Sequence, residues 1–121
     1  QLMRNIIFLL TKEKRYQEVV NTTMQLVQLD PTSDTFEQLG WAEFRLGDYE
    51  ASLGAYRTAI DYDANNWRAL NGVGVNELNN WLLGDKTDLD SYQAARTVFR
   101  RSLAIHPDQP KVITLILRYG L

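Results

Sequence analysis

The chain repeats its own pattern at a fixed spacing. The segment LGWAEF, residues 39–44, aligns with VGVNEL, residues 73–78, which begins 34 residues later. The segment DYEASLGAYRTAI, residues 48–60, aligns with SYQAARTVFRRSL, residues 91–103, at an offset of 43. The second offset exceeds the first by nine, which places a nine-residue insertion in the segment GDKTDLD, within residues 83–91. Self-similarity with a period of 20–50 residues is typical of proteins built from stacked structural repeats.

Within each copy the apolar residues recur with a helical period. Tyr49, Leu53, Tyr56 and Ile60 are spaced as on one face of an amphipathic helix, and no stretch alternates as a half-buried strand would. The three prolines, at positions 31, 107 and 110, fall where the helical pattern stops or restarts. We therefore predict an all-α protein of about seven helices, over residues 2–11, 15–29, 34–46, 49–62, 66–83, 91–105 and 110–119.

Composition narrows the class of protein. A chain of 121 residues is long enough for one domain with a core, and a net charge of −2 does not indicate a binder of nucleic acid or of membrane surfaces. The absence of cysteine excludes disulfides and thiolate metal sites, and no apolar run is long enough to span a bilayer. Because the sequence begins with Gln1, we expect a piece of a longer protein or a processed form. The compartment is not determined; we expect a soluble protein, with the cytoplasm as first expectation and the periplasm as alternative.

The sequence contains no recognisable catalytic or metal-binding constellation. Its single histidine, His106, precedes Pro107 at the end of a predicted helix, where a polar cap is favourable. The acidic residues of GDKTDLD lack the spacing of a calcium loop, so we expect a solvated loop whose Asp88 or Asp90 caps the next helix. We therefore expect no enzymatic activity, no cofactor and no metal.

The repeated pattern resembles the tetratricopeptide repeat, a helix-turn-helix unit of 34 residues. Residues 33–66 supply Phe36, Leu39, Gly40, Gly47, Tyr49, Ser52, Tyr56 and Ala59, and residues 67–109 supply Leu70, Val73, Gly74, Tyr92, Ala95, Phe99, Ser102 and Pro107. Residues 1–32 resemble a degenerate first repeat, and residues 110–121 a partial repeat or capping helix. The pattern departs from the family at Glu43 and Glu77, which replace the usual tyrosine. The resemblance implies a single domain that is a right-handed α-solenoid of stacked antiparallel helix pairs.

Small and aromatic residues should have different tasks in such a stack. We expect Gly40 with Ser52, and Gly74 with Ala95, to let two antiparallel helices approach closely. We expect a second set of residues to fill the space between one helix pair and the next: Tyr49, Tyr56, Tyr92 and Phe99.

The resemblance also implies a concave groove, lined by the first helix of each pair, that holds a peptide or helix of a partner protein. The family's groove positions carry over to Arg4, Phe8, Glu37, Trp41, Phe44, Arg45, Arg68, Asn71, Val75 and Leu78, with Thr11, Asp34 and Asn79 beside them. One branch of the family clamps a C-terminal carboxylate here, but Phe8 and Gly72 stand where polar residues are needed, so we do not expect that clamp.

Apolar residues at the groove positions instead predict an anchor strip rimmed by charge. Phe8, Trp41, Val75 and Leu78 would suit a hydrophobic or amphipathic segment. The alternative is that these side chains pack against one another and leave little groove. Glu43 and Glu77 also have two interpretations: a shared acidic site for a basic ligand, or, as we favour, a buried hydrogen bond or an ion pair with a nearby arginine such as Arg45 or Arg68.

Both ends of the chain are apolar nearly all round, in IIFLL (6–10) and in VITLIL (112–117). A terminal helix of a solenoid normally has a polar outer face. We therefore expect these ends to be covered, by further repeats or by a second copy of the chain. Two functional hypotheses follow: a noncatalytic protein-interaction scaffold, and an assembly module that self-associates through its ends.

Overall fold

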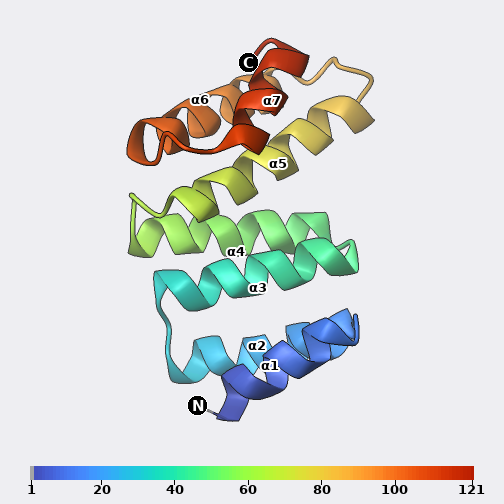
Figure 1. Ribbon diagram of the computed structural model, residues 1–121. Helices are drawn as coiled ribbons and strands as arrows, with labels where there is room; N and C mark the ends of the chain where they lie inside the picture. The colour runs from blue at the N-terminus through green and yellow to red at the C-terminus, as the bar shows by residue number, and fades with distance from the viewer. Residues whose placement is uncertain (1) are drawn as a thin grey trace.

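The computed structural model describes residues 2–121, which form seven helices and no strand (Figure 1). The helices are α1 (Leu2–Lys12), α2 (Tyr16–Leu29), α3 (Ser33–Leu46), α4 (Tyr49–Tyr62), α5 (Trp67–Leu83), α6 (Leu89–Ile105) and α7 (Pro110–Tyr119). Antiparallel pairs α1–α2, α3–α4 and α5–α6 are layered in chain order, and α7 packs on the last pair, so the two termini lie at opposite ends. The predicted fold class, an all-α solenoid of stacked helix pairs, is confirmed.

Polar side chains set the beginnings of several helices. Thr32 and Thr35 cap α3 reciprocally: the Thr35 amide donates to Thr32 Oγ1 at 3.1 Å, and the Thr32 amide donates to Thr35 Oγ1 at 3.0 Å. Gly47, with a φ of +93°, makes the predicted tight turn between α3 and α4. Asp88, rather than Asp90, caps α6 by accepting from the Ser91 amide. Helix α6 therefore begins at Leu89, two residues before the predicted start.

Ser52 and Gly40 bring the two helices of the central pair together, as predicted. Ser52 is fully buried, and its Oγ donates to the Gly40 carbonyl at 2.7 Å. Asn76 Nδ2 in turn donates to Ser52 Oγ at 3.1 Å, which ties α5 to the preceding pair. The small residues Gly40 and Ser52 connect α3 with α4, and Asn76 links α5 to both.

The aromatic side chains fill the stack unequally. Phe99 is fully buried against Gly74, where a Cβ would lie 2.6 Å from the Phe99 ring; Gly74 therefore makes room for Phe99 from α6. The ring centres of Tyr92 and Trp81 lie 4.8 Å apart, and Tyr92 Oη donates to the Gly120 carbonyl at 2.7 Å. Tyr49, at the first position of α4, is 41% exposed, so the expectation that it fills the space between pairs is wrong.

The two equivalent glutamates lie in different surroundings. Glu77 is buried, and its Oε1 lies 3.8 Å from Arg57 Nη2. Asn80 Nδ2 also donates to Glu77 Oε1 at 3.3 Å, so the favoured interpretation, a hydrogen bond or an ion pair with an arginine, is confirmed for Glu77. The arginine is Arg57 of α4, not Arg45 or Arg68. Glu43 Oε1 is buried without a hydrogen bond, and this burial, with the nearby charge of Asp48, raises the pKa of Glu43 to about 7.

Candidate peptide-binding groove

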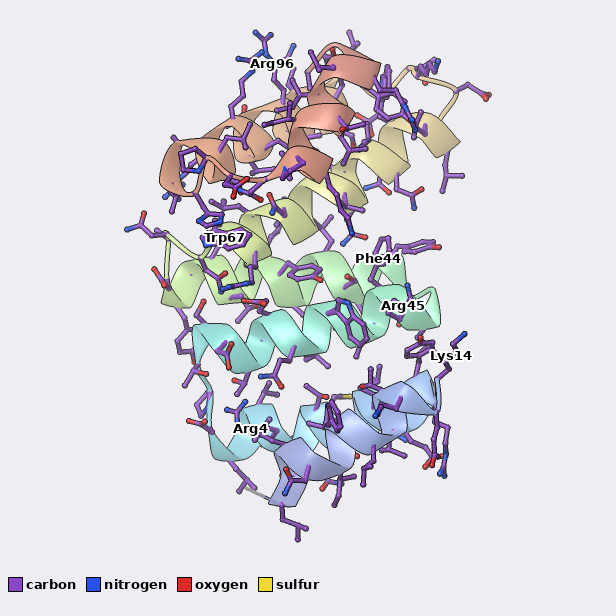
Figure 2. The ribbon with its side chains drawn as sticks, viewed as in Figure 1. Arg4, Lys14, Phe44, Arg45, Trp67 and Arg96 are labelled. Atoms are coloured by element: carbon purple, nitrogen blue, oxygen red, sulfur yellow. The ribbon has the colours of Figure 1, made fainter. Side chains whose placement is uncertain are left out.

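Helices α1, α3 and α5 lie on one face of the stack (Figures 1 and 2). Two adjoining cavities lie along this face. The first has a volume of about 310 Å³ and is lined by Ile7, Val19, Glu37, Gln38, Trp41, Tyr56 and Arg68. The second has a volume of about 280 Å³ and is lined by Trp41, Phe44, Arg45, Tyr56, Arg68, Asn71, Gly72 and Val75. Because they share Trp41, Tyr56 and Arg68, the two cavities adjoin, and we refer to them together as the groove.

Most of the residues proposed from the sequence line this groove: Glu37, Trp41, Phe44, Arg45, Arg68, Asn71 and Val75. The alternative, that some of these side chains pack against one another, describes Leu78 and Val75, which belong to one apolar cluster. Trp41 remains 40% exposed. It therefore offers an aromatic surface at the junction of the two cavities.

Three of the predicted residues lie elsewhere. Leu78 does not reach the groove, because α7 covers the C-terminal half of α5 and leaves Leu78 5% exposed in a core with Phe99. Phe8 is 60% exposed and lines neither cavity; the adjacent residue of α1, Ile7, lines the first one instead. Arg4 lines neither cavity.

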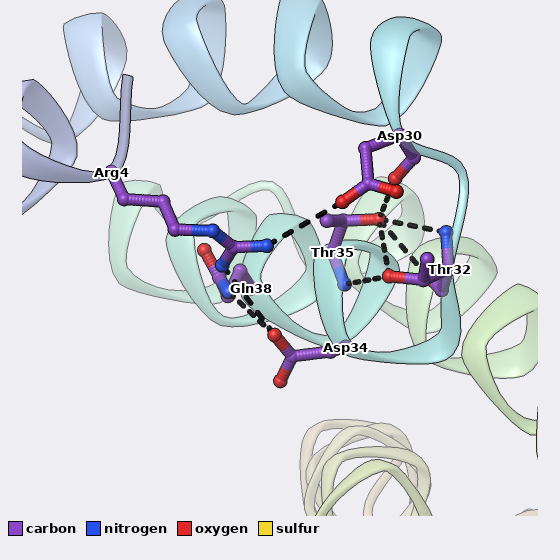
Figure 3. Close-up of polar contacts among 6 residues, drawn as sticks. All are labelled: Arg4, Asp30, Thr32, Asp34, Thr35 and Gln38. Atoms are coloured by element: carbon purple, nitrogen blue, oxygen red, sulfur yellow. Dashed lines mark hydrogen bonds and ion pairs between the residues drawn. The ribbon is translucent and has the colours of Figure 1, made fainter. Parts of the chain in front are cut away.

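Arg4 holds α1 to the turn between α2 and α3 (Figure 3). Its Nη2 lies 3.6 Å from Asp30 Oδ2, and its Nη1 lies 3.5 Å from Asp34 Oδ2. Gln38 Nε2 also donates to Asp34 Oδ2, at 3.1 Å. Arg4 therefore belongs to a polar cluster at the border of the groove.

Two arginines that line the groove are positioned by aromatic rings. The Arg45 Nη2 atom donates to Tyr16 Oη at 3.0 Å, and its guanidinium carbon lies 5.9 Å from the Trp41 ring centre. The Arg68 guanidinium carbon lies 4.4 Å from the Trp67 ring centre. Within residues 2–121, no carboxylate oxygen lies within 4.0 Å of either guanidinium.

One acidic residue, Glu37, lines the first cavity but not the second. The pKa of Glu37 is raised, mainly by burial and to a smaller extent by the nearby charge of Asp34. A hydrogen bond with Asn66 and the charge of Arg68 partly offset this rise. The part of the chain that the structure describes contains no group of three or more side chains suited to hold a metal ion. The geometry is suited to binding an extended or helical segment.

No family model and no curated protein matches the sequence. Solved structures do. The first tetratricopeptide-repeat (TPR) domain of Spaghetti (RPAP3), bound to the HSP90 peptide SRMEEVD, superposes with a TM-score of 0.84 at 14% identity, over 98% of this chain and 88% of that one. The Arabidopsis OM64 TPR domain superposes with a TM-score of 0.82 at 18% identity, over 97% and 90%. PcrH, in complex with the chaperone-binding region of PopD, superposes with a TM-score of 0.74 at 22% identity, over 98% of this chain and 84% of that one.

The chain has the TPR fold. At these identities the likeness establishes the arrangement of helices, while the side chains of the groove are this chain's own.

Tyr56 is a groove residue that the sequence reasoning did not include. It comes from α4, the second helix of its pair, whereas the carried-over positions all lie on first helices. A Cβ would lie 2.9 Å from the Tyr56 ring at Gly40 and 2.5 Å from it at Gly72, so the ring packs against both glycines. It thereby reaches the floor of both cavities with 7% of its surface exposed. The paired glycines were the available signal.

The groove of the TPR domain continues towards α7. A further cavity, of about 470 Å³, is lined by Trp67, Asn71, Asp108, Gln109, Pro110, Lys111 and Val112. Asn71 Nδ2 donates to Gln109 Oε1 at 2.7 Å, which joins α5 to the start of α7. The insertion at residues 84–88 lines none of these three cavities.

None of the helices in residues 2–121 is long and apolar enough to cross a membrane.

Proposed function

We propose that this TPR protein is a noncatalytic scaffold that holds a peptide or helix of a partner protein in the groove of α1, α3 and α5. The observation that carries the proposal is the pair of adjoining cavities along this face, both lined by Trp41 and Tyr56. Concave, mostly apolar clefts with a few convergent polar groups are the usual form of a binding site.

The structural neighbours support this proposal at the level of the fold. The Spaghetti (RPAP3) domain is bound to an HSP90 peptide, PcrH to a region of PopD, and the Yersinia enterocolitica chaperone SycD to a peptide of YopD. Several proteins with this arrangement of helices thus bind segments of other proteins.

The groove favours a hydrophobic or amphipathic segment. Trp41, Phe44 and Val75 provide an apolar surface, and arginines lie beside it. Large aromatic side chains in partly enclosed positions are common hot spots of protein interfaces. We therefore expect an apolar side chain of the partner to pack on Trp41.

A selection from a library of random displayed peptides tests the proposal. We expect the wild-type protein to enrich peptides whose affinity for a Trp41→Ala variant falls at least about tenfold, the effect of removing a moderate hot spot. Leu29→Ala is the matched control, because Leu29 on α2 is 72% exposed and lines none of the groove cavities. Equal binding to the Trp41→Ala variant, once circular dichroism shows it to be folded, would reject the groove.

Exposed apolar residues at the two ends favour a second candidate function, self-assembly. Leu2 and Leu9 of α1 are 74% and 59% exposed, and Ile113 and Leu117 of α7 are 42% and 79% exposed. Such surfaces are commonly covered in a solenoid, by further repeats or by another molecule. Sedimentation should detect a concentration-dependent dimer that Leu117→Glu disrupts. A monomer at every concentration would remove this candidate and leave the first untouched.

A further inference from the structure

The cavity between α3 and α5 differs from its neighbour in charge. Arg45 and Arg68 both line it, and no aspartate or glutamate does. The guanidinium groups are held by aromatic rings, and neither has a carboxylate within 4.0 Å among the described residues. Glu37, in the first cavity, is close enough to Arg68 for their charges to interact, but it does not line this one. Two cations beside an apolar surface are complementary to an anionic group on the occupant.

Tyr56 supplies a further donor. Its side chain is 7% exposed and lines this cavity. Within residues 2–121 its hydroxyl makes no hydrogen bond and is not a fully buried atom, so it is open to solvent in the groove. Burial, with a smaller contribution from Glu37, raises the pKa of Tyr56, so the hydroxyl keeps its proton and can donate it.

We infer that the cavity between α3 and α5 receives the carboxylate of an aspartate or glutamate side chain within the partner segment, next to an apolar residue packed on Trp41. This inference rests on the proposed function of the groove. The carboxylate would accept hydrogen bonds from the arginines and from Tyr56 Oη, since arginine and tyrosine are donors of suitable geometry. A basic residue at the same place would meet two like charges.

The groove geometry favours a side chain over the end of a chain. This cavity shares Trp41 with the cavity towards α1 and Asn71 with the cavity towards α7. A bound segment therefore has room to continue in both directions from the carboxylate. The polar residues that would clamp a chain terminus are absent, since Gly72 and Phe8 occupy those positions.

The peptide selection described above provides the probes. We expect the enriched sequences to place an internal Asp or Glu beside an aliphatic or aromatic residue. A fluorescein-labelled peptide of the consensus sequence, with its C-terminus amidated, and a copy with the acidic residue changed to its amide are then compared by fluorescence anisotropy. The amide peptide should bind roughly 10- to 100-fold more weakly, the usual effect of losing a charge-assisted hydrogen bond.

Three variants locate the contact. Arg68→Gln should abolish the preference for the acidic peptide over its amide, while Tyr56→Phe, which keeps the ring, should reduce it about threefold to tenfold. Arg96→Gln is the matched control: Arg96 is an exposed arginine of α6 that lines none of the groove cavities and lies away from Arg45 (Figure 2). Thermal melting checks that each variant is folded.

The outcomes separate the two levels of the proposal. Peptides that need Trp41 but bind equally well as acid and amide would overturn the carboxylate contact and leave the groove function standing. An acidic residue enriched solely at a free C-terminus, or a basic consensus, would also overturn this inference. Peptides that bind independently of Trp41 would overturn the groove function itself.

Discussion

Substituting Gly72 by alanine is the sharpest test of how Tyr56 is held. The new methyl group would lie 2.5 Å from the Cδ1, Cδ2 and Cε1 atoms of Tyr56, well inside the usual carbon–carbon contact of about 3.5–4.0 Å. The ring also packs against Gly40, where a Cβ would lie 2.9 Å from it. The clash therefore falls on a rigid ring that is already in contact with α3.

Two opposing effects set the magnitude. Alanine is favoured over glycine by roughly 0.8–1.0 kcal/mol in the interior of a helix. Overpacking a close-packed site typically costs about 1–3 kcal/mol. The clash should win, so Gly72→Ala should lower the free energy of unfolding by up to about 2 kcal/mol.

Gly54→Ala is the matched control within the same protein. Gly54 lies in α4, is exposed, and has nothing within 4 Å of where a Cβ would be. The same substitution there should stabilise the protein by about 0.5–1 kcal/mol. The difference between the two variants, about 1–3 kcal/mol, isolates the contact with Tyr56.

Urea unfolding followed by circular dichroism at 222 nm measures both free energies. Adding Tyr56→Leu to each background completes a double-mutant cycle, in which the destabilisation caused by Gly72→Ala should shrink because the smaller side chain can yield. If Gly72→Ala stabilises the protein as much as Gly54→Ala does, the proposed packing of Tyr56 against α5 is wrong.

Two further predictions concern buried polar groups. Because the folded-state pKa of Glu43 is raised from 4.5 to about 7, the native state binds more protons than the unfolded state in this window, and stability should fall as pH rises through it. The free energy of unfolding of Glu43→Gln, relative to that of the wild type, should therefore rise by about 1–2 kcal/mol from pH 4.5 to pH 8, a range that allows for the partial solvent exposure of Glu43. A difference between the two urea midpoints that does not change with pH would contradict this. Ser52→Ala removes the partner of the Gly40 carbonyl and of Asn76 Nδ2, and should cost about 1–3 kcal/mol in the same assay, whereas Ser52→Cys, a weaker donor of similar size, should cost less.

The fold was largely predictable because its determinants are local and repeated. Gly47 and the caps near it mark the turn between α3 and α4 in the sequence itself, and the predicted limits of α4 and α7 agree with the structure. The Gly40–Ser52 contact was also predictable, since two small residues recur at the positions where paired helices cross. The start of α6 was missed by two residues because Asp88 and Asp90 are both suitable caps, and local sequence does not choose between them.

The groove was less predictable because its boundaries depend on contacts between distant segments. Leu78 has the spacing of a groove residue, but α7 covers it, and the sequence of α5 contains no sign of that covering. In α1, Ile7 lines the cavity in place of Phe8, a difference of one position in a helix whose repeat is degenerate. The partner of Glu77, Arg57, also comes from outside the aligned positions.

Gly72 connects the stability of the stack with the proposed recognition of a carboxylate. Read as a groove position alone, a glycine there removes a polar side chain and weakens the site. In the structure, its missing side chain lets Tyr56 reach the groove from α4, where Tyr56 lines the same cavity as Arg68. In the proposed binding mode, the Tyr56 hydroxyl of α4 thus takes the place of the donor that a polar residue at position 72 of α5 would supply. The unfolding cycle and the anisotropy titration therefore examine one contact from two sides: Gly72→Ala should lower both stability and the preference for the acidic peptide, whereas Tyr56→Phe should lower the preference while the ring continues to fill its place.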